Sequence, residues 1–500
     1  MIRLSKSKIM SSLQCLKRVH LEINRKDLTH YSKATEAAFA VGHAVGDIAI
    51  QLYSDSTTNS DIATNGNAGT YIEYHGGSFA QALAQTQQLM TSLHRAPVFE
   101  ATLQHDDVLV RQDILLPIDN NGDASWRIVE VKAATKLKPE YTNDCAVQAW
   151  VHLQSGYPLS RISLAHINNE FVYQGDDDYV GLLVEHDLTE AVFDLLPQVP
   201  IWIERAREAV VGAVPDVPLG PHCTSPYACP LMDFCWPTDS RYPVRGLGGS
   251  SKKLGAWAAA GHCDIREVPI ADISSEKQQR IHRVTTQEGA ELLPGARAFV
   301  EALVYPRFYL DFETVGPAIP VWEGTRPYQA LPFQWSCHIE WAAGVLEHME
   351  FLDLSGDPPM RALAEQMIAA LEAAGPVLMY TKYEERVIND LIKLFPDLAD
   401  PLQAIIDRLV DLHPITRDNY YHPDMLGSWS IKAVLPTIAL AMDYALLEGI
   451  QEGTQASTAY LEAIHPDTSV QRQAEIRNDL LKYCKHDTEA MVQLVHFFAA

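Results

Sequence analysis

From about residue 300 onward, short apolar segments that suit β-strands alternate with longer segments that suit helices. The strand candidates are RFYLDFET, FQWSCHIEW and PVLMYT, and the helix candidates include MRALAEQMIAALEAAG and YEERVINDLIKLF. Alternation of this kind is typical of α/β domains, in which helices cover the faces of a sheet. We therefore expect an α/β fold for residues 301–500.

The rest of the chain separates into two further regions. Residues 1–240 mix helical patterns with short strands and end in the cysteine-bearing segment PHCTSPYACPLMDFCWP. Residues 241–300 are rich in Gly and Ser at first and polar afterwards, which predicts a linker with small helices of its own. A chain of 500 residues with 47% hydrophobic content can bury more than one core, so this division into domains is reasonable.

Charge and hydropathy exclude several classes of protein. No apolar run reaches transmembrane length and the N-terminus has no apolar centre typical of a secretory signal, so we expect a cytoplasmic protein without a membrane partner. The formal net charge of −25 argues against a broadly basic surface that coats nucleic acid. It is compatible with a nuclease, because metal sites are built from acids and a substrate groove needs only local positive charge.

The segment RFYLDFETVG places two carboxylates one residue apart, directly after an apolar run. In an extended strand Asp311 and Glu313 share one face, while Phe312 points to the other. Two carboxylates held side by side repel each other unless a cation lies between them. The alternative is a polar strand end that leads into a turn at Gly316 and Pro317.

Further acids follow at the ends of later predicted elements. Glu384 stands where a strand passes into a helix, and Asp411 follows an apolar pair in RLVDLHPI. Tyr483 and Asp487 are four residues apart in LLKYCKHDTEAM, so a helix would carry both on one face. Tyr483 could hold a metal-bound water while Asp487 holds the metal. The alternative is an ordinary amphipathic helix with a solvated Asp487.

These acids, in this order, resemble the DEDD exonucleases of the RNase H-like fold in their tyrosine variant, over roughly residues 300–500. The resemblance implies two divalent ions, Mg²⁺ or Mn²⁺, about 3.5–4 Å apart, that support removal of the 3′-terminal nucleotide. It also implies a water-positioning role for Tyr483. The family's second motif usually has Asp where this chain has Glu384, and Asp411 is the alternative ligand. The implied metal ligands are Asp311, Glu313, Glu384 and Asp487.

A second group of motifs lies in VLVRQDILLPIDNNGDASWRIVEVKAAT, which predicts a hairpin with a turn around DNNGD. The first strand contains Asp113, and the second carries Glu130 and Lys132 on one face. An acid followed by E-x-K resembles the PD-(D/E)XK nucleases. In that chemistry the two acids hold a divalent ion against the scissile phosphate, and the lysine orients or helps deprotonate the attacking water. The alternative is a surface salt bridge between Glu130 and Lys132.

Two more residues extend this resemblance to the RecB-type branch of the superfamily. Gln148, in the predicted helix EYTNDCAVQAWVHLQSG, matches that branch's glutamine motif. His43, in AVGHAVGDIA, matches its upstream histidine, which can complete the metal shell. The alternative for His43 is a core or capping histidine.

The eight cysteines are too sparse for a disulfide scaffold, so clustering among them points to metal. RecB-type nucleases of the CRISPR-associated and AddB-like kinds hold a [4Fe–4S] cluster with one cysteine near the N-terminus and three after the nuclease core. The resemblance assigns that cluster to four cysteines here, and it leaves Zn²⁺ as the alternative. The four are Cys15, Cys223, Cys229 and Cys235.

Together the two halves resemble an uncharacterised bacterial family that fuses a RecB-like nuclease domain to a DEDD-like domain. The resemblance implies a metal-dependent nuclease with two centres, in DNA repair or in defence against foreign nucleic acid. Neither set of motifs distinguishes DNA from RNA, since the chemistry acts on the phosphodiester. Single strands or 3′ ends are the expected substrates. The alternative is a nucleic-acid-binding or scaffold protein in which one or both centres are inactive.

Overall fold

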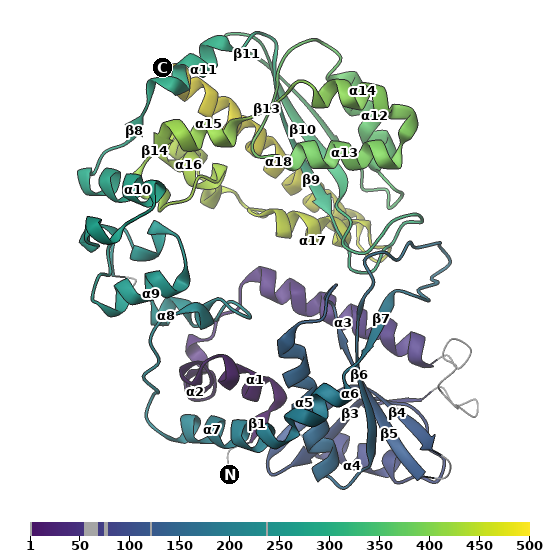
Figure 1. Cartoon of the computed structure of the whole chain (residues 1–500). Helices are drawn as coiled ribbons and strands as arrows, with labels where there is room; N and C mark the ends of the chain where they lie inside the picture. The colour runs from purple at the N-terminus through teal and green to yellow at the C-terminus, as the bar shows by residue number, and fades with distance from the viewer. Residues whose placement is uncertain (1–2, 55–68, 75–78, 121–122, 237–238) are drawn as a thin grey trace. The chain divides into compact units, whose positions relative to one another are not determined.

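The computed structural model describes residues 3–54, 69–74, 79–120, 123–236 and 239–500. The chain divides into two compact units (Figure 1). The N-terminal unit comprises Met1–Trp236 together with Pro317–Tyr328, and the C-terminal unit comprises Pro237–Gly316 and Gln329–Ala500. Each unit combines helices with a mixed sheet, so the predicted α/β class is confirmed.

The N-terminal unit is built on a sheet with the strand order β2-β3-β4-β5-β6-β7, and β1 pairs in parallel with β4. The neighbours β3, β4 and β5 are antiparallel, whereas β5 and β6 are parallel. The predicted hairpin is therefore β4 and β5, and part of its turn, residues 121–122, lies outside the described residues. The strands are β1 (Leu4–Ser5), β2 (Thr70–Tyr71), β3 (Val98–His105), β4 (Val108–Asn120), β5 (Asp123–Lys132), β6 (Leu159–Ile167) and β7 (Leu183–Asp187).

Two helices cover opposite faces of this sheet. On β4 and β5, Leu115 and Ile128 share one buried core with the helix α5, while Ile114 and Val129 share another with the helix α3. Adjacent residues of a strand point to opposite faces, so α5 and α3 lie on opposite sides. The helices are α1 (Lys6–Gln14), α2 (Leu16–Asn24), α3 (Lys33–Ser54), α4 (Ala80–Met90), α5 (Pro139–Gln154), α6 (Thr189–Leu195), α7 (Val199–Val211) and α8 (Met232–Cys235).

The C-terminal unit has a sheet with the order β11-β10-β9-β12-β13. The first three strands pair antiparallel, and β12 and β13 continue the sheet in parallel with β9. The predicted strands at 307, 333 and 376 correspond to β9, β10 and β12, whereas the sequence did not indicate the largely exposed β11 or the short β13. The strands are β9 (Arg307–Val315), β10 (Leu331–Ala342), β11 (Val345–Leu352), β12 (Val377–Met379) and β13 (Leu409–Asp411), with a separate pair of β8 (Glu291–Leu292) and β14 (Tyr420–Tyr421).

Helices cover both faces of this sheet as well. Two successive residues of β10 show this, because the side chain of Gln334 donates to the carbonyl of Leu480 in α18 and that of Trp335 donates to the carbonyl of Leu363 in α12. The long helix α18 therefore lies on one face and α12 on the other. The helices are α9 (Ser251–Ala259), α10 (Glu276–Gln287), α11 (Pro294–Ala302), α12 (Met360–Ala370), α13 (Tyr383–Leu394), α14 (Ala399–Ile406), α15 (Leu412–Asn419), α16 (Ile431–Ile438), α17 (Gly453–Ile464) and α18 (Val470–Ala499).

The region predicted as a linker, residues 241–300, contains α9, α10 and most of α11 and is grouped with the C-terminal unit. Among the helices of the described residues, none is both long and apolar enough to cross a membrane. The 30 residues of α18 include charged side chains along its length.

Candidate active sites

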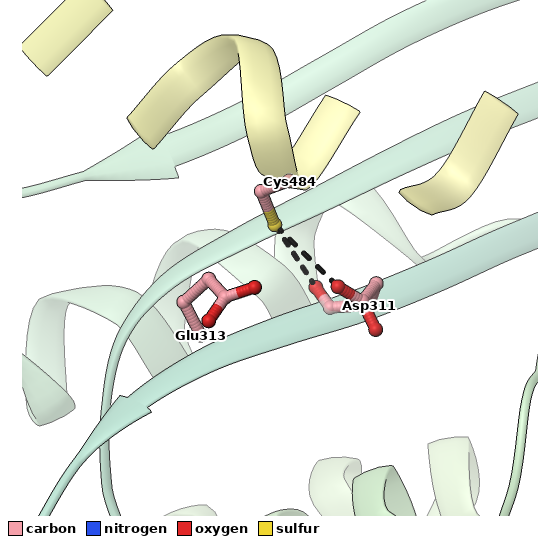
Figure 2. Close-up of side chains that lie close together, drawn as sticks. All are labelled: Asp311, Glu313 and Cys484. Carbon is pink, nitrogen blue, oxygen red and sulfur yellow. Dashed lines mark hydrogen bonds between the residues drawn. The ribbon is translucent and has the colours of Figure 1, made fainter. Parts of the chain in front are cut away.

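The central strand β9 carries the D-x-E pair on the face that α18 covers. Asp311 pairs in register with Ser336 and Glu313 with Gln334, and both partners on β10 contact α18. Figure 2 shows the Cys484 sulfur of α18 pointing toward Asp311, with Glu313 beside them on the same strand. The sulfur lies 3.8 Å from Asp311 Oδ2, and ligand atoms of Asp311, Glu313 and Cys484 all lie within 4.8 Å of one another.

Two more carboxylates reach this pair from helices. Glu384 lies in the first turn of α13, directly after β12, and Asp487 lies in the middle of α18. Both side chains are buried, at 2% and 8% exposure. The structure therefore brings the four acids of the DEDD-like motif from three elements to one place, where Glu313, Glu384 and Asp487 all act electrostatically on Asp311.

Burial opposes the ionisation of all four acids, and neighbouring carboxylates add to this effect at Asp311, Glu313 and Glu384. Burial and the neighbouring carboxylates hold the pKa values of Asp311 and Glu313 well above their usual range. Burial, with the charges of Asp411 and Asp487, raises the pKa of Glu384 to about 8. Burial also raises the pKa of Asp487 to about 6, although a hydrogen bond from Tyr444 and the charge of Lys432 oppose this. The protein alone therefore provides too little positive charge for four ionised carboxylates.

Lys432, near the start of α16, is a cation that acts on Glu313 and Asp487. Its ammonium donates to the Tyr483 hydroxyl at 2.9 Å and to the carbonyl of Gln451 at 2.7 Å. The Tyr444 hydroxyl donates to Asp487. Neither Lys432 nor Tyr444 was identified from the sequence, since neither belongs to a motif with the acids. The structure thus places Tyr483 between a lysine and the carboxylates, one turn of helix before Asp487.

Asp411 has a structural role at the end of β13. Its Oδ1 accepts from the backbone amides of Thr381, at 3.0 Å, and His413, at 2.9 Å. It therefore caps α15 and holds the turn between β12 and α13, which carries Glu384. Its charge also acts on Glu384, so Asp411 stays the alternative ligand that the sequence suggested.

The donor set of this centre fits a divalent cation. Carboxylate oxygens are the ligands that Mg²⁺ prefers, and Mn²⁺ accepts the same set. In the described part of the chain, the Oε2 atom of Glu384 is buried without a hydrogen-bond partner. A buried carboxylate oxygen without a donor is costly, and a bound cation would satisfy it. Burial and the adjacent carboxylates raise the pKa of Cys484 far above its usual value, so this thiol is a neutral neighbour of the acids.

In the N-terminal unit, Glu130 and Lys132 of β5 face α5. The Lys132 ammonium contacts Glu130 Oε1 at 2.6 Å, and Gln148 of α5 donates to Glu130 Oε2 at 2.5 Å. On the neighbouring strand β4, Asp113 accepts the amide of Val131 at 2.7 Å. Four of the five residues predicted for this centre therefore lie around β4, β5 and α5.

Three charged residues that the sequence did not single out complete this group. Lys6, at the start of α1, reaches Glu130 at 2.8 Å and Asp144 at 3.2 Å. Asp144, one helical turn before Gln148 on α5, also contacts Lys132 at 2.7 Å. Glu100 of β3 acts electrostatically on Asp113 and has a left-handed backbone with φ of 57°. For a residue other than glycine such a conformation is strained, which is common at functional sites.

Neighbouring charges shift the pKa values of the two carboxyl groups of this centre in opposite directions. Burial and the charge of Glu130 raise the pKa of Asp113 to about 8, against the opposing charges of Lys6 and Lys132. Burial also disfavours ionised Glu130, but the ammonium groups of Lys132 and Lys6 overcome it and hold its pKa well below the usual range. The fifth predicted residue, His43, is exposed on α3 and acts electrostatically on Glu100.

The four cysteines assigned to a cluster line one small pocket in the N-terminal unit. Cys15 lies between α1 and α2, and the other three lie in the segment that ends with α8. The Gln14 amide donates to the carbonyls of His222, at 2.6 Å, and Tyr227, at 2.7 Å, so it fastens α1 to that segment. Burial raises the pKa values of Cys229 and Cys235, and the cations Arg18 and Lys17 respectively oppose these shifts.

The two units thus define an α/β protein with two buried acidic centres and a four-cysteine pocket. Residues 308–430 match the model of a family described as a domain of unknown function (DUF2779). That segment includes Asp311, Glu313 and Glu384 but ends before Tyr483 and Asp487. A search of curated proteins found no match to the chain.

Proposed function

We propose that this protein is a metal-dependent nuclease whose C-terminal unit removes nucleotides from 3′ ends. The observation that carries this proposal is the group of Asp311, Glu313, Glu384 and Asp487, one half-buried and three buried carboxyl groups whose pKa values are all raised. Acids with perturbed pKa values that converge from a central strand, a helix start and a late helix are typical of functional sites.

The sheet supports an RNase H-like assignment for this unit. Numbered by their order in the chain, its five strands lie across the sheet as 3-2-1-4-5, with the first three antiparallel and the last two parallel to the first. The acids lie on the central strand and on the flanking helices. Two bound Mg²⁺ or Mn²⁺ ions would activate water and stabilise the leaving oxygen. The four carboxylates would hold the ions, and Tyr483, fixed by Lys432, would orient the attacking water.

The N-terminal unit supports a second nuclease centre of the PD-(D/E)XK kind. Asp113 and Glu130 would hold a divalent ion against the scissile phosphate, with Gln148 positioning Glu130. Lys132 would orient the water, since its ammonium already lies against Glu130 and Asp144. Lys6 lies where a bound cation would compete with it for Glu130, so we expect it to move when metal binds.

The proposal is tested with 5′-labelled single-stranded DNA and RNA, incubated with Mg²⁺, Mn²⁺ or EDTA. We expect the Lys132→Ala protein, in which the N-terminal centre is impaired, to produce a ladder that shortens one nucleotide at a time from the 3′ end with either metal. EDTA should abolish the ladder. If the unmodified protein also leaves single- and double-stranded DNA and RNA intact with both metals, it is instead a binding or scaffold protein with inactive centres.

The four-cysteine pocket supports a [4Fe–4S] cluster as a structural staple between the two ends of the N-terminal unit. We expect anaerobically purified protein to be brown and to contain about four irons per chain. Cys235→Ala should lose the colour and the iron, whereas Cys263→Ala, a matched change in the C-terminal unit, should keep both. A colourless protein with stoichiometric zinc would show that the alternative ligand chemistry is the right one.

A further inference from the structure

A cavity of about 640 Å³ in the C-terminal unit lies beside the four-carboxylate centre. This volume is in the range of small-ligand sites, about 300–1,000 Å³. The lining comes from the end of β12, from α15, from α10 and from the segment that starts α16. None of these residues was predicted as a site residue from the sequence.

The lining of the cavity is basic in a strongly acidic chain. Lys277, Arg417 and Lys432 line it, and none of the described residues that line it is acidic. The Arg417 guanidinium also pairs with the adjacent Asp418 at 2.8 Å, so an anion in the cavity would share this side chain with Asp418. The chain as a whole has 64 acidic and 39 basic residues. Gly427–Ser430 and the first residues of α16 also line it, so the positive end of a helix dipole lies at the same space. A cavity of this kind selects for an anion.

Lys432 joins the cavity to the acids. Its side chain lines the cavity and its ammonium donates to the Tyr483 hydroxyl at 2.9 Å. Its charge also opposes the rise in the pKa values of Glu313 and Asp487. Thr381, another lining residue, is fixed to Asp411 through its backbone amide at 3.0 Å. An anion in the cavity would therefore lie next to the water-positioning tyrosine.

The wall of the cavity is fixed before any ligand binds. Gly427 has a φ of 78°, and a Cβ atom there would overlap the carbonyl oxygen of Gly246. The Trp429 indole donates to the carbonyl of Tyr420 at 2.7 Å, and the Tyr380 hydroxyl donates to the carbonyl of Trp429 at 2.6 Å. The Lys277 ammonium lies 4.8 Å from the centre of the Trp429 ring. Because these side chains are already held in place, they lose little conformational entropy when a ligand binds.

We propose that this cavity binds the phosphodiester backbone of a single nucleic-acid strand, on the 5′ side of the nucleotide held at the four-carboxylate centre. The inference rests on the proposed nuclease function and adds its substrate-holding residues, Lys277 and Arg417. Lysine, arginine and helix amides are the groups that bind phosphate oxygens. Contacts to phosphate carry no base information, so DNA and RNA strands should both bind here.

The test measures binding without cleavage. The full-length Asp311→Asn protein is titrated in EDTA against a 5′-fluorescein-labelled 12-nucleotide DNA or RNA at several NaCl concentrations. In the combined Lys277→Ala and Arg417→Ala variant we expect the affinity at low salt to fall about tenfold, uniformly across sequences. The slope of log K against log[NaCl] should become shallower by about 1.4, or about 0.7 for each lost contact to a single strand.

The matched control changes a lysine and an arginine elsewhere on the same unit. Lys393 and Arg361 are both exposed and pair with Asp390 and Asp397, so Lys393→Ala with Arg361→Ala should leave affinity and slope unchanged.

A second measurement locates the strand directly. A 4-thiothymidine at the third position from the 3′ end should crosslink to peptides that contain Lys277 or residues 413–432.

Each proposal can fail separately. Unchanged affinity and slope in the Lys277→Ala, Arg417→Ala variant, or crosslinks confined to the N-terminal unit, would overturn the cavity assignment even if wild-type protein trims 3′ ends. The opposite result is also possible: the double variant loses binding and the expected crosslinks form, but the protein never cleaves with Mg²⁺ or Mn²⁺. That result would support the cavity assignment and reject the nuclease function.

Discussion

Asp311→Asn should abolish trimming of 3′ ends while leaving the protein folded. Asp311 lies on the central strand, its carboxylate shares one face with Glu313, and Glu384 and Asp487 act on it from two helices. Loss of a metal ligand should cost more than the roughly 10- to 100-fold that loss of an outer hydrogen-bond partner costs. We therefore expect the rate of one-nucleotide trimming by the Lys132→Ala protein to fall at least about 1,000-fold when Asp311→Asn is added.

Stability distinguishes this loss from unfolding. Because Asp311 is destabilised as an anion by burial and by three neighbouring carboxylates, a neutral asparagine should leave the melting temperature of metal-free protein unchanged or raise it. Asp397→Asn is the matched control, since Asp397 is exposed and pairs only at the surface with Arg361. Trimming that survives in Asp311→Asn at more than a tenth of its starting rate would show that β9 does not carry the chemistry.

The same variants test whether the two centres act separately. Lys132→Ala should remove cleavage by the N-terminal unit and leave trimming intact, and Asp311→Asn should do the reverse. Within the N-terminal unit, Lys6 and Lys132 both contact Glu130. If either change removed both activities with the fold intact, a single composite centre would be required.

Local periodicity explains what the sequence could predict. The two-residue spacing of Asp311 and Glu313 sets their common face as soon as β9 forms, and the four-residue spacing of Tyr483 and Asp487 does the same for α18. The position of Glu384 at a junction between strand and helix could also be predicted, because an apolar run precedes it and an amphipathic pattern follows.

Long-range pairing explains what the sequence could not predict. Lys6 reaches Glu130 only because β1 pairs with β4, which lies more than 100 residues further along the chain. Lys432 reaches Tyr483 because α16 packs against α18, and no local spacing relates the two. Asp144 is an exception that could have been found, since it lies four residues before Gln148 on the same helix face.

A divalent metal should stabilise the C-terminal unit above neutral pH and lose this effect in acid. In metal-free protein the pKa of Glu384 is raised to about 8 and that of Asp487 to about 6, both above their values in an unfolded chain. The folded state therefore binds more protons than the unfolded state between about pH 4 and pH 8, and stability falls as the pH rises through this interval. In EDTA we expect the melting temperature to be lower at pH 8.5 than at pH 5.5.

Mg²⁺ or Mn²⁺ should restore the stability that the metal-free protein loses at high pH, because the ion and the protons compete for the same carboxylates. At a metal concentration about 100 times the dissociation constant, the gain should be roughly 2.7 kcal/mol, or several degrees for a unit of this size. The measurement is thermal unfolding at both pH values, with and without metal, of the Asp113→Asn protein, which removes the raised carboxyl of the N-terminal unit. Adding Asp311→Asn and Asp487→Asn should make the melting temperature depend less on pH and should remove its increase with metal. A metal-induced rise that is equal at pH 5.5 and pH 8.5, or that persists after both acids are replaced, would place the bound ion elsewhere.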